Sequence, residues 1–316
     1  MSTAVAKIQE PKGNDLAKKT VCIKILMHKF GETRKANNAH VSVEGSEGNS
    51  KPASPDKEMV YVSKRLFDSP EMREIRRFDF ETRNLLFNPA FGLCLPFEIG
   101  IHLLPIAKIQ QTEDLLKQRA EEREALVKKF LKAYPELVKN ASKRLRGLYN
   151  ATDYPPVKEV AKEFSFYWQY VSFDVPGKLK ELSSEMWNQE REKAAKRMAE
   201  AAENIQLVLR ESMLQLVKKM SDRLKSDPDV KPLVFRNTLV ANLTEFLGNF
   251  DFRNVTDDAQ LQAVVKQARS LLDGVDADAL RNTDTLREKV QKEMGKMAKS
   301  LEKMTTRGNR KFRLEE

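Results

Sequence analysis

Basic side chains crowd the C-terminal end of the chain, in a pattern that suits binding to phosphates or carboxylates. Between residues 287 and 313, ten Lys and Arg residues stand against three Glu residues, an excess of seven positive charges. The candidate surface for nucleic acid or a protein partner consists of Lys292, Lys296, Lys299, Lys303, Arg307, Arg310, Lys311 and Arg313. A basic helix attracts a nucleic-acid backbone by counterion release, and it also fits an acidic groove of a protein. The alternative is a helix that packs by its apolar side and leaves the lysines in solvent.

The densest aromatic cluster of the chain lies in residues 164–176. Its alternating members are Phe164, Phe166, Trp168 and Tyr170. On a strand these four side chains share one face, and some single-strand nucleic-acid binders stack bases on such a row. Those platforms carry flanking cations, whereas the lysines nearest to this row lie outside it. We therefore favour a core strand or a hairpin arm that packs against helices, with the stacking platform as the alternative.

Motifs of common enzyme classes are missing from the sequence. It contains no phosphate-binding G-x-x-x-x-G-K-[ST], no G-x-G-x-x-G, no G-x-S-x-G, no H-E-x-x-H and no C-x-x-C. Cys22, His28 and His40 could form a zinc site only if a sheet gathered them, and their spacing fits no metal-binding module. We expect no catalytic residue, no metal ligand and no cofactor, and a protein that is not an enzyme.

Long helices must position these residues. Apolar side chains recur in steps of three and four in residues 109–148, 198–224 and 286–304, which places them on one stripe of each helix. Charged residues make up 32% of the chain, and glycine is scarce, which fits long helices with solvated faces. The expected fold class is mainly α, an elongated bundle of long antiparallel helices with coiled-coil character plus a small N-terminal α+β part.

Breaks in composition divide the chain into five segments. We expect a disordered tail 1–19, a small α+β domain 20–105 with a flexible loop 44–56, a long helical hairpin 106–227 that includes the aromatic segment 164–176, C-terminal helices 228–305 and a basic tail 306–316. Three strands are predicted in the α+β domain, at 20–27, 39–43 and 58–63. Ser69 and Pro70 predict a helix start, and Pro135 predicts a kink or break in the first long helix.

The termini and the cysteines bear on localisation. The N-terminus has no apolar run of signal-peptide length, and the apolar stretches near residue 100 are interrupted by Gly and Pro. Two cysteines in unrelated contexts indicate a reducing compartment. We expect a cytoplasmic protein without membrane contact, located in the bacterial host cytoplasm if the gene belongs to a phage. The net charge of +10 would allow the protein to bind an acidic partner. However, positively and negatively charged residues are interspersed over most of the chain.

Three segments together carry a resemblance to a known family: TVCIKILMHKFGETRK at 20–35, GIHLLPI at 100–106 and YWQYVSFDVPGKL at 167–179, followed by EREKAA at 190–195. On these segments the chain resembles a family of bacterial and phage proteins of unknown function. Relatives are often encoded near a MoxR-type AAA+ ATPase and a von Willebrand A-type protein. The resemblance implies an accessory or adaptor of an ATPase-driven remodelling system, and it brings no catalytic residues with it.

The sequence thus favours a non-enzymatic protein-interaction or scaffold protein. A protein partner is expected, either a MoxR-type AAA+ ATPase or a second copy of the chain. The alternative is a nucleic-acid-binding protein that uses the basic C-terminal helix, with weak binding.

Overall fold

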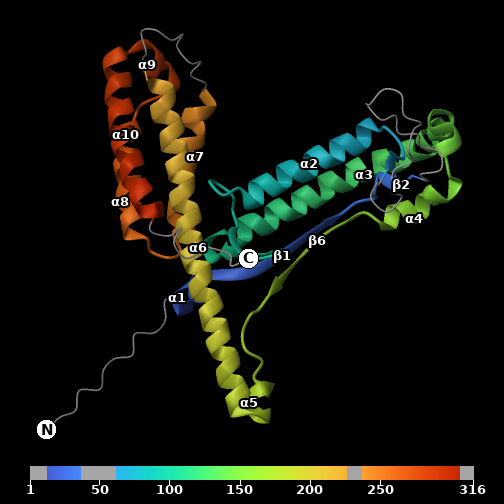
Figure 1. Ribbon diagram of the computed structural model, residues 1–316, viewed down its shortest axis with the longest axis horizontal. Coiled ribbons are helices and arrows are strands. Elements are labelled where there is room, and N and C mark those ends of the chain that lie inside the picture. The colour runs from blue at the N-terminus through green and yellow to red at the C-terminus, as the bar shows by residue number, and fades with distance from the viewer. Residues whose placement is uncertain (1–12, 37–61, 226–236, 307–316) are drawn as a thin grey trace, which may run out of the picture. The chain divides into compact units, whose positions relative to one another are not determined.

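The computed structural model describes residues 13–36, 62–225 and 237–306, and it confirms that the protein is mainly α (Figure 1). The chain divides into two compact units. Unit 1 contains Met1–Lys24, Arg83–Thr112 and Gln169–Glu316, and unit 2 contains Ile25–Thr82 and Glu113–Trp168. The predicted segments follow one another along the chain, whereas both units draw on residues from either side of residue 105.

A small sheet has the strand order β4-β5-β1-β6. The strands are β1 Thr20–His28, β4 Leu95–Glu98, β5 Ile101–Pro105 and β6 Ser165–Val171. Strand β1 pairs antiparallel with β5, so that Ile23 lies opposite His102. Strands β4 and β5 form a hairpin that turns at Gly100, whose φ of 77° lies in the left-handed region that favours glycine. The predicted strand 20–27 is confirmed, and the apolar stretches near residue 100 contain β4 and β5.

One correction concerns the N-terminal segment, where part of the predicted disordered tail is a helix. Helix α1 spans Gly13–Lys19 and directly precedes β1. Leu16 is buried in the core of unit 1, and the hydroxyl of Thr20 donates a hydrogen bond of 2.8 Å to the carbonyl of Leu16. A single buried leucine was too weak a signal to detect beside the polar residues around it.

Helices make up the rest of unit 1: α5 Lys178–Leu182, α6 Ser184–Leu224, α7 Asn237–Arg253, α8 Ala259–Leu272, α9 Ala277–Asn282 and α10 Asp284–Thr306. The long helices α6 and α10 lie side by side (Figure 1). The carboxylate of Asp258 caps α8 by accepting a hydrogen bond of 3.1 Å from the backbone of Leu261. The helices predicted from the apolar stripes at 198–224 and 286–304 are confirmed as parts of α6 and α10, while the six-residue α9 was not predicted.

Unit 2 is built around two long helices, each of which lies mostly within this unit. They are α2 Pro70–Phe87 and α3 Ile109–Leu145, accompanied by α4 Val157–Lys162 and a hairpin of β2 Thr33–Lys35 and β3 Ser63–Arg65. The predicted start of α2 is confirmed, because the backbone of Met72 donates a 3.1 Å hydrogen bond to the hydroxyl of Ser69. One-turn 3₁₀ helices occur at Ile106–Lys108, Arg146–Leu148 and Ala151–Asp153.

Of the kink or break predicted at Pro135, the break is wrong, because α3 continues through this residue. Tyr134 before the proline and Ala141 after it are both buried, so packing on either side offsets the missing backbone hydrogen bond. Tyr134 belongs to an aromatic cluster with Phe30, Phe67 and Phe130, and its hydroxyl donates to the carbonyl of Pro155 at 3.1 Å. This cluster is the core of unit 2.

Several predicted features lie outside the described residues. They are the tail up to residue 12, the strand 39–43, the loop 44–56, most of the strand 58–63 and the basic tail from residue 307 onward.

Candidate interaction surfaces

The outer face of α10 carries a row of lysines, called the lysine stripe below. The stripe consists of Lys289, Lys292, Lys296, Lys299 and Lys303, all of which are exposed. The opposite face of the helix buries Val290, Met294, Met297 and Leu301. The lysines are three or four residues apart, so they form one line of about 21 Å at 1.5 Å per residue. The other predicted basic residues, Arg307, Arg310, Lys311 and Arg313, lie outside the described residues.

Carboxylates neutralise only part of the lysine stripe. The ammonium group of Lys296 lies 2.6 Å from the carboxylate of Glu293. This hydrogen bond, together with the positive charges of Lys296, Lys292 and Lys289, lowers the pKa of Glu293. Within the described part of the chain, Lys292, Lys299 and Lys303 have no carboxylate at ion-pair distance. The stripe is therefore a line of positive charge that fits an acidic surface or a phosphate backbone.

A second surface of unit 1 is the arm, defined as α5 together with residues 184–200 of α6. In the described segment 184–200 no residue is buried, whereas the buried face of α6 begins at Ala201. The arm also exposes apolar side chains, because Leu182 is 80% exposed and Met186 is 53% exposed. The buried face of this 41-residue helix is thus confined to its part from Ala201 onward, and before it only partly buried side chains such as Met198 reach the core of unit 1.

Trp187 joins the two helices of the arm. Its ring lies between two cations, with the ammonium of Lys180 at 5.3 Å and the guanidinium of Arg191 at 4.6 Å from the ring centroid. At exposed sites each such contact contributes about 0.5–1 kcal/mol. The hydroxyl of Ser183 caps α6 by accepting a 3.2 Å hydrogen bond from the backbone of Met186. These local contacts hold α5 against α6 and keep Leu182 and Met186 at the surface.

The aromatic row of β6 is not the core strand that the sequence favoured. Phe164, Phe166 and Trp168 are only partly buried, and Tyr170 is 45% exposed. The reason is the place of β6 at the edge of the sheet, where a strand has a neighbour on one side only. Phe164 still packs on the unit 2 cluster, 5.6 Å from Phe130 between ring centroids.

The stacking alternative for this row also meets an obstacle. The indole N–H of Trp168 donates a 2.8 Å hydrogen bond to a carboxylate oxygen of Glu113. Glu113, which also pairs with Lys117 at 3.5 Å, thus occupies the polar edge of the indole ring. The row therefore fits a half-exposed edge strand better than a nucleic-acid platform.

Of the three residues considered for metal binding, Cys22 and His28 are described by the structure. His40 lies outside the described residues, and among the described ones no group of three or more His, Cys, Asp or Glu side chains is placed to hold a metal ion. Burial raises the pKa of the Cys22 thiol to about 11 and that of the Cys94 thiol to about 12. Both thiols therefore remain protonated near neutral pH, which makes them poor nucleophiles and poor ligands.

Sequence reasoning missed the buried charges that hold each unit together. In unit 2, Arg123 of α3 pairs with Asp79 of α2 at 2.7 Å. In unit 1, Arg210 of α6 pairs at 2.7 Å with Asp258, the residue that caps α8. Each of these residues looks in the sequence like one more charge on a helix, and nothing in its spacing separates it from the solvated ones.

Comparison with known proteins returns no matching family model, no matching curated protein and no matching solved structure. Among the described residues, no helix combines the length and the apolar character that crossing a membrane requires.

Proposed function

We propose that this chain is a non-enzymatic protein-interaction protein and that the arm of unit 1 is its docking element. The observation that carries the proposal is the uncovered first part of α6 with its exposed Leu182 and Met186. Contiguous exposed apolar side chains commonly mark protein-protein contacts. A partner helix that lies along the arm would bury these side chains in the same way that α10 covers the second half of α6.

The partner that the family resemblance implies is a MoxR-type AAA+ ATPase, with the chain as its accessory or adaptor. Alternatively, the arm binds the arm of a second copy of the chain, which is also a protein-interaction function. The arm supports both, because it carries Lys and Arg interspersed with Glu and so has no strong charge preference.

Binding experiments with arm variants test this proposal. Leu182→Glu combined with Met186→Glu should abolish binding to a MoxR-type AAA+ ATPase, or abolish concentration-dependent self-association, while the melting temperature stays unchanged. Phe80→Glu is a matched control, because Phe80 is also an exposed apolar residue, 70% exposed, but lies on α2 outside the arm. Equal binding by the arm variant and the control would refute the role of the arm.

The lysine stripe supports nucleic-acid binding as a second candidate function. Charge reversal at Lys292, Lys296, Lys299 and Lys303 should then lower the slope of log affinity against log salt by about one for each phosphate that the variant no longer neutralises. Under the first proposal, the wild-type protein binds DNA no more tightly than the ~100 µM to 1 µM typical of non-specific binding at physiological salt. Tighter binding that the reversal abolishes would favour the second function.

A further inference from the structure

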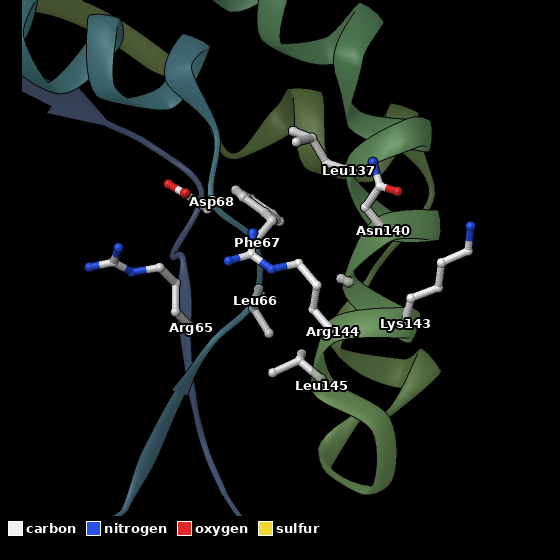
Figure 2. Close-up of a pocket in the computed structure, with 10 residues that line it drawn as sticks. Arg65, Leu66, Phe67, Asp68, Leu137, Asn140, Lys143, Arg144 and Leu145 are labelled. Atoms are coloured by element: carbon white, nitrogen blue, oxygen red, sulfur yellow. The ribbon is translucent and has the colours of Figure 1, made fainter.

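Unit 2 contains a pocket between the C-terminal part of α3 and residues 65–68 (Figure 2). Its volume is about 540 Å³, within the roughly 300–1,000 Å³ of typical ligand pockets. All its lining residues belong to unit 2, so the pocket is complete within that unit.

A small residue in the apolar stripe of α3 creates the hollow. Leu137, Ala141 and Leu145 continue the stripe at steps of four, so they line the same face of the helix. Ala141 is buried but short, and it leaves space between the two leucines. Buried Leu66 and Phe67 form the wall opposite the helix. These five residues form the apolar part of a pocket lining that also contains polar and charged side chains.

Basic residues outnumber acidic ones in the lining of this pocket. Among the described lining residues, Arg65, Lys143 and Arg144 are basic, and Asp68 alone is acidic. The carboxylate of Asp68 is already paired with the guanidinium of Arg73. Figure 2 shows the side chain of Arg144 reaching from α3 toward the segment that carries Leu66 and Phe67. Within the described part of the chain, neither Arg65 nor Arg144 has a carboxylate at ion-pair distance.

Helix electrostatics explain part of this arrangement. Basic residues in the last turn of α3 complement the negative end of its dipole. That effect accounts for Lys143 and Arg144, but it requires neither the hollow at Ala141 nor Arg65 on the opposite wall. A ligand that offers both an apolar group and negative charge would use all of these features.

We propose that this pocket binds an acidic peptide segment of a partner protein. An aliphatic side chain of the peptide fills the space beside Ala141, and a neighbouring carboxylate pairs with Arg144. The proposal rests on the protein-interaction function proposed above, and it adds the chemistry of the partner and a contact in unit 2. A nucleic-acid strand fits less well, because Phe67 packs against Phe30 and Phe130 and presents no open ring face for a base.

A phage-displayed library of random 12-residue peptides, panned on the full-length protein, provides the probe. Enriched peptides should combine several Asp or Glu residues with an aliphatic residue. Arg144→Glu should weaken binding of the enriched peptides by about tenfold or more, because it turns an attraction into a repulsion. Lys139→Glu is the matched control, since it makes the same charge change at an exposed position of α3 outside the pocket lining, and it should leave affinity nearly unchanged.

Ala141→Leu provides a second variant that does not depend on charge. The larger side chain should fill the hollow and block the peptide, while the circular dichroism spectrum and melting temperature show that the fold is kept. If this variant fails to fold, Arg144→Glu, at an exposed position, still decides the outcome.

The peptide-binding experiment can test the pocket independently of the proposed role of the arm. Peptide binding should be unchanged in the Leu182→Glu, Met186→Glu variant, because the arm belongs to unit 1. The pocket proposal is wrong if no peptide is enriched, if enriched peptides lack carboxylates, or if Arg144→Glu and Lys139→Glu behave alike. It is also wrong if a 12-nucleotide single strand displaces the peptides with higher affinity than theirs. None of these results would affect the interpretation of the binding experiment with the arm variant.

Discussion

Replacing Arg123 with Met should strongly destabilise unit 2. Arg123 is 2% exposed, and its guanidinium holds both oxygens of Asp79, at 2.7 and 3.2 Å. It also donates to the carbonyls of His28 at 2.7 Å and Ser165 at 3.3 Å. One side chain of α3 thus holds α2, β1 and β6 together within unit 2. Without it, the carboxylate of Asp79 would be buried with no counter-charge.

The size of the effect follows from the cost of an unpaired buried charge. Removing one partner of a buried pair typically costs about 3–5 kcal/mol, a large share of the roughly 5–15 kcal/mol that stabilises a domain. Replacing both partners, with Arg123→Met and Asp79→Leu, should restore part of this stability because no charge remains buried. The restoration should be incomplete, because the two backbone carbonyls are still left without their donor.

The two tryptophans allow unit 2 to be followed by itself. Trp168 belongs to unit 2 and Trp187 to unit 1, so in a Trp187→Phe background the fluorescence reports on unit 2 during urea unfolding. Lys128→Ala is the control, because it breaks an exposed pair with Glu124 on the same helix and should cost less than about 1 kcal/mol. If Arg123→Met shifted the transition no more than this control, or if the double variant were less stable than Arg123→Met, the reasoning would be refuted.

Three further predictions concern single residues. Cys22 and Cys94, with their raised pKa values of about 11 and 12, should react with Ellman's reagent at pH 8 only as fast as the protein unfolds; rapid reaction of the native protein would contradict their burial. Trp168→Ala should cost less than the ~3–5 kcal/mol of a fully buried tryptophan, because β6 lies at the sheet edge, and urea unfolding followed by circular dichroism measures this cost. Ser183→Ala should cost about 1 kcal/mol of stability in α6 because it removes the cap; unchanged amide exchange at the start of α6 would show that the cap is unimportant.

The regular features of the fold could be predicted from the sequence because they depend on local patterns. The stripe of α6 and the cap at Ser69 each involve residues within a few positions of one another, and both predictions were confirmed. Predictions from local patterns were wrong where contacts between residues far apart in the sequence determine the structure. A kink or break was expected at Pro135, but α3 is not broken there, and buried residues on both sides of the proline support the helix. The alternating aromatics of β6 indicated a core strand, although alternation alone does not show whether a strand lies at an edge.

The candidate sites could likewise be predicted only where they depend on a local sequence pattern. The lysine stripe was visible because it repeats along one helix. The arm could not be recognised in the sequence, because the apolar stripe of α6 does not show which part of the helix other helices cover. The unit 2 pocket needs residues 65–68 to meet the end of α3, some 70 positions later in the chain, and no periodic pattern connects them.

Hydrogen–deuterium exchange of the arm tests the central claim most directly. The full-length protein would be measured at low concentration, at high concentration, and mixed with a MoxR-type AAA+ ATPase. Backbone amides of residues 178–200 should exchange rapidly in the dilute protein, because the described residues leave this segment uncovered. They should become protected either at high concentration or in the mixture, and Leu182→Glu with Met186→Glu should remove that protection. Unchanged exchange of residues 178–200 in both cases would contradict the account.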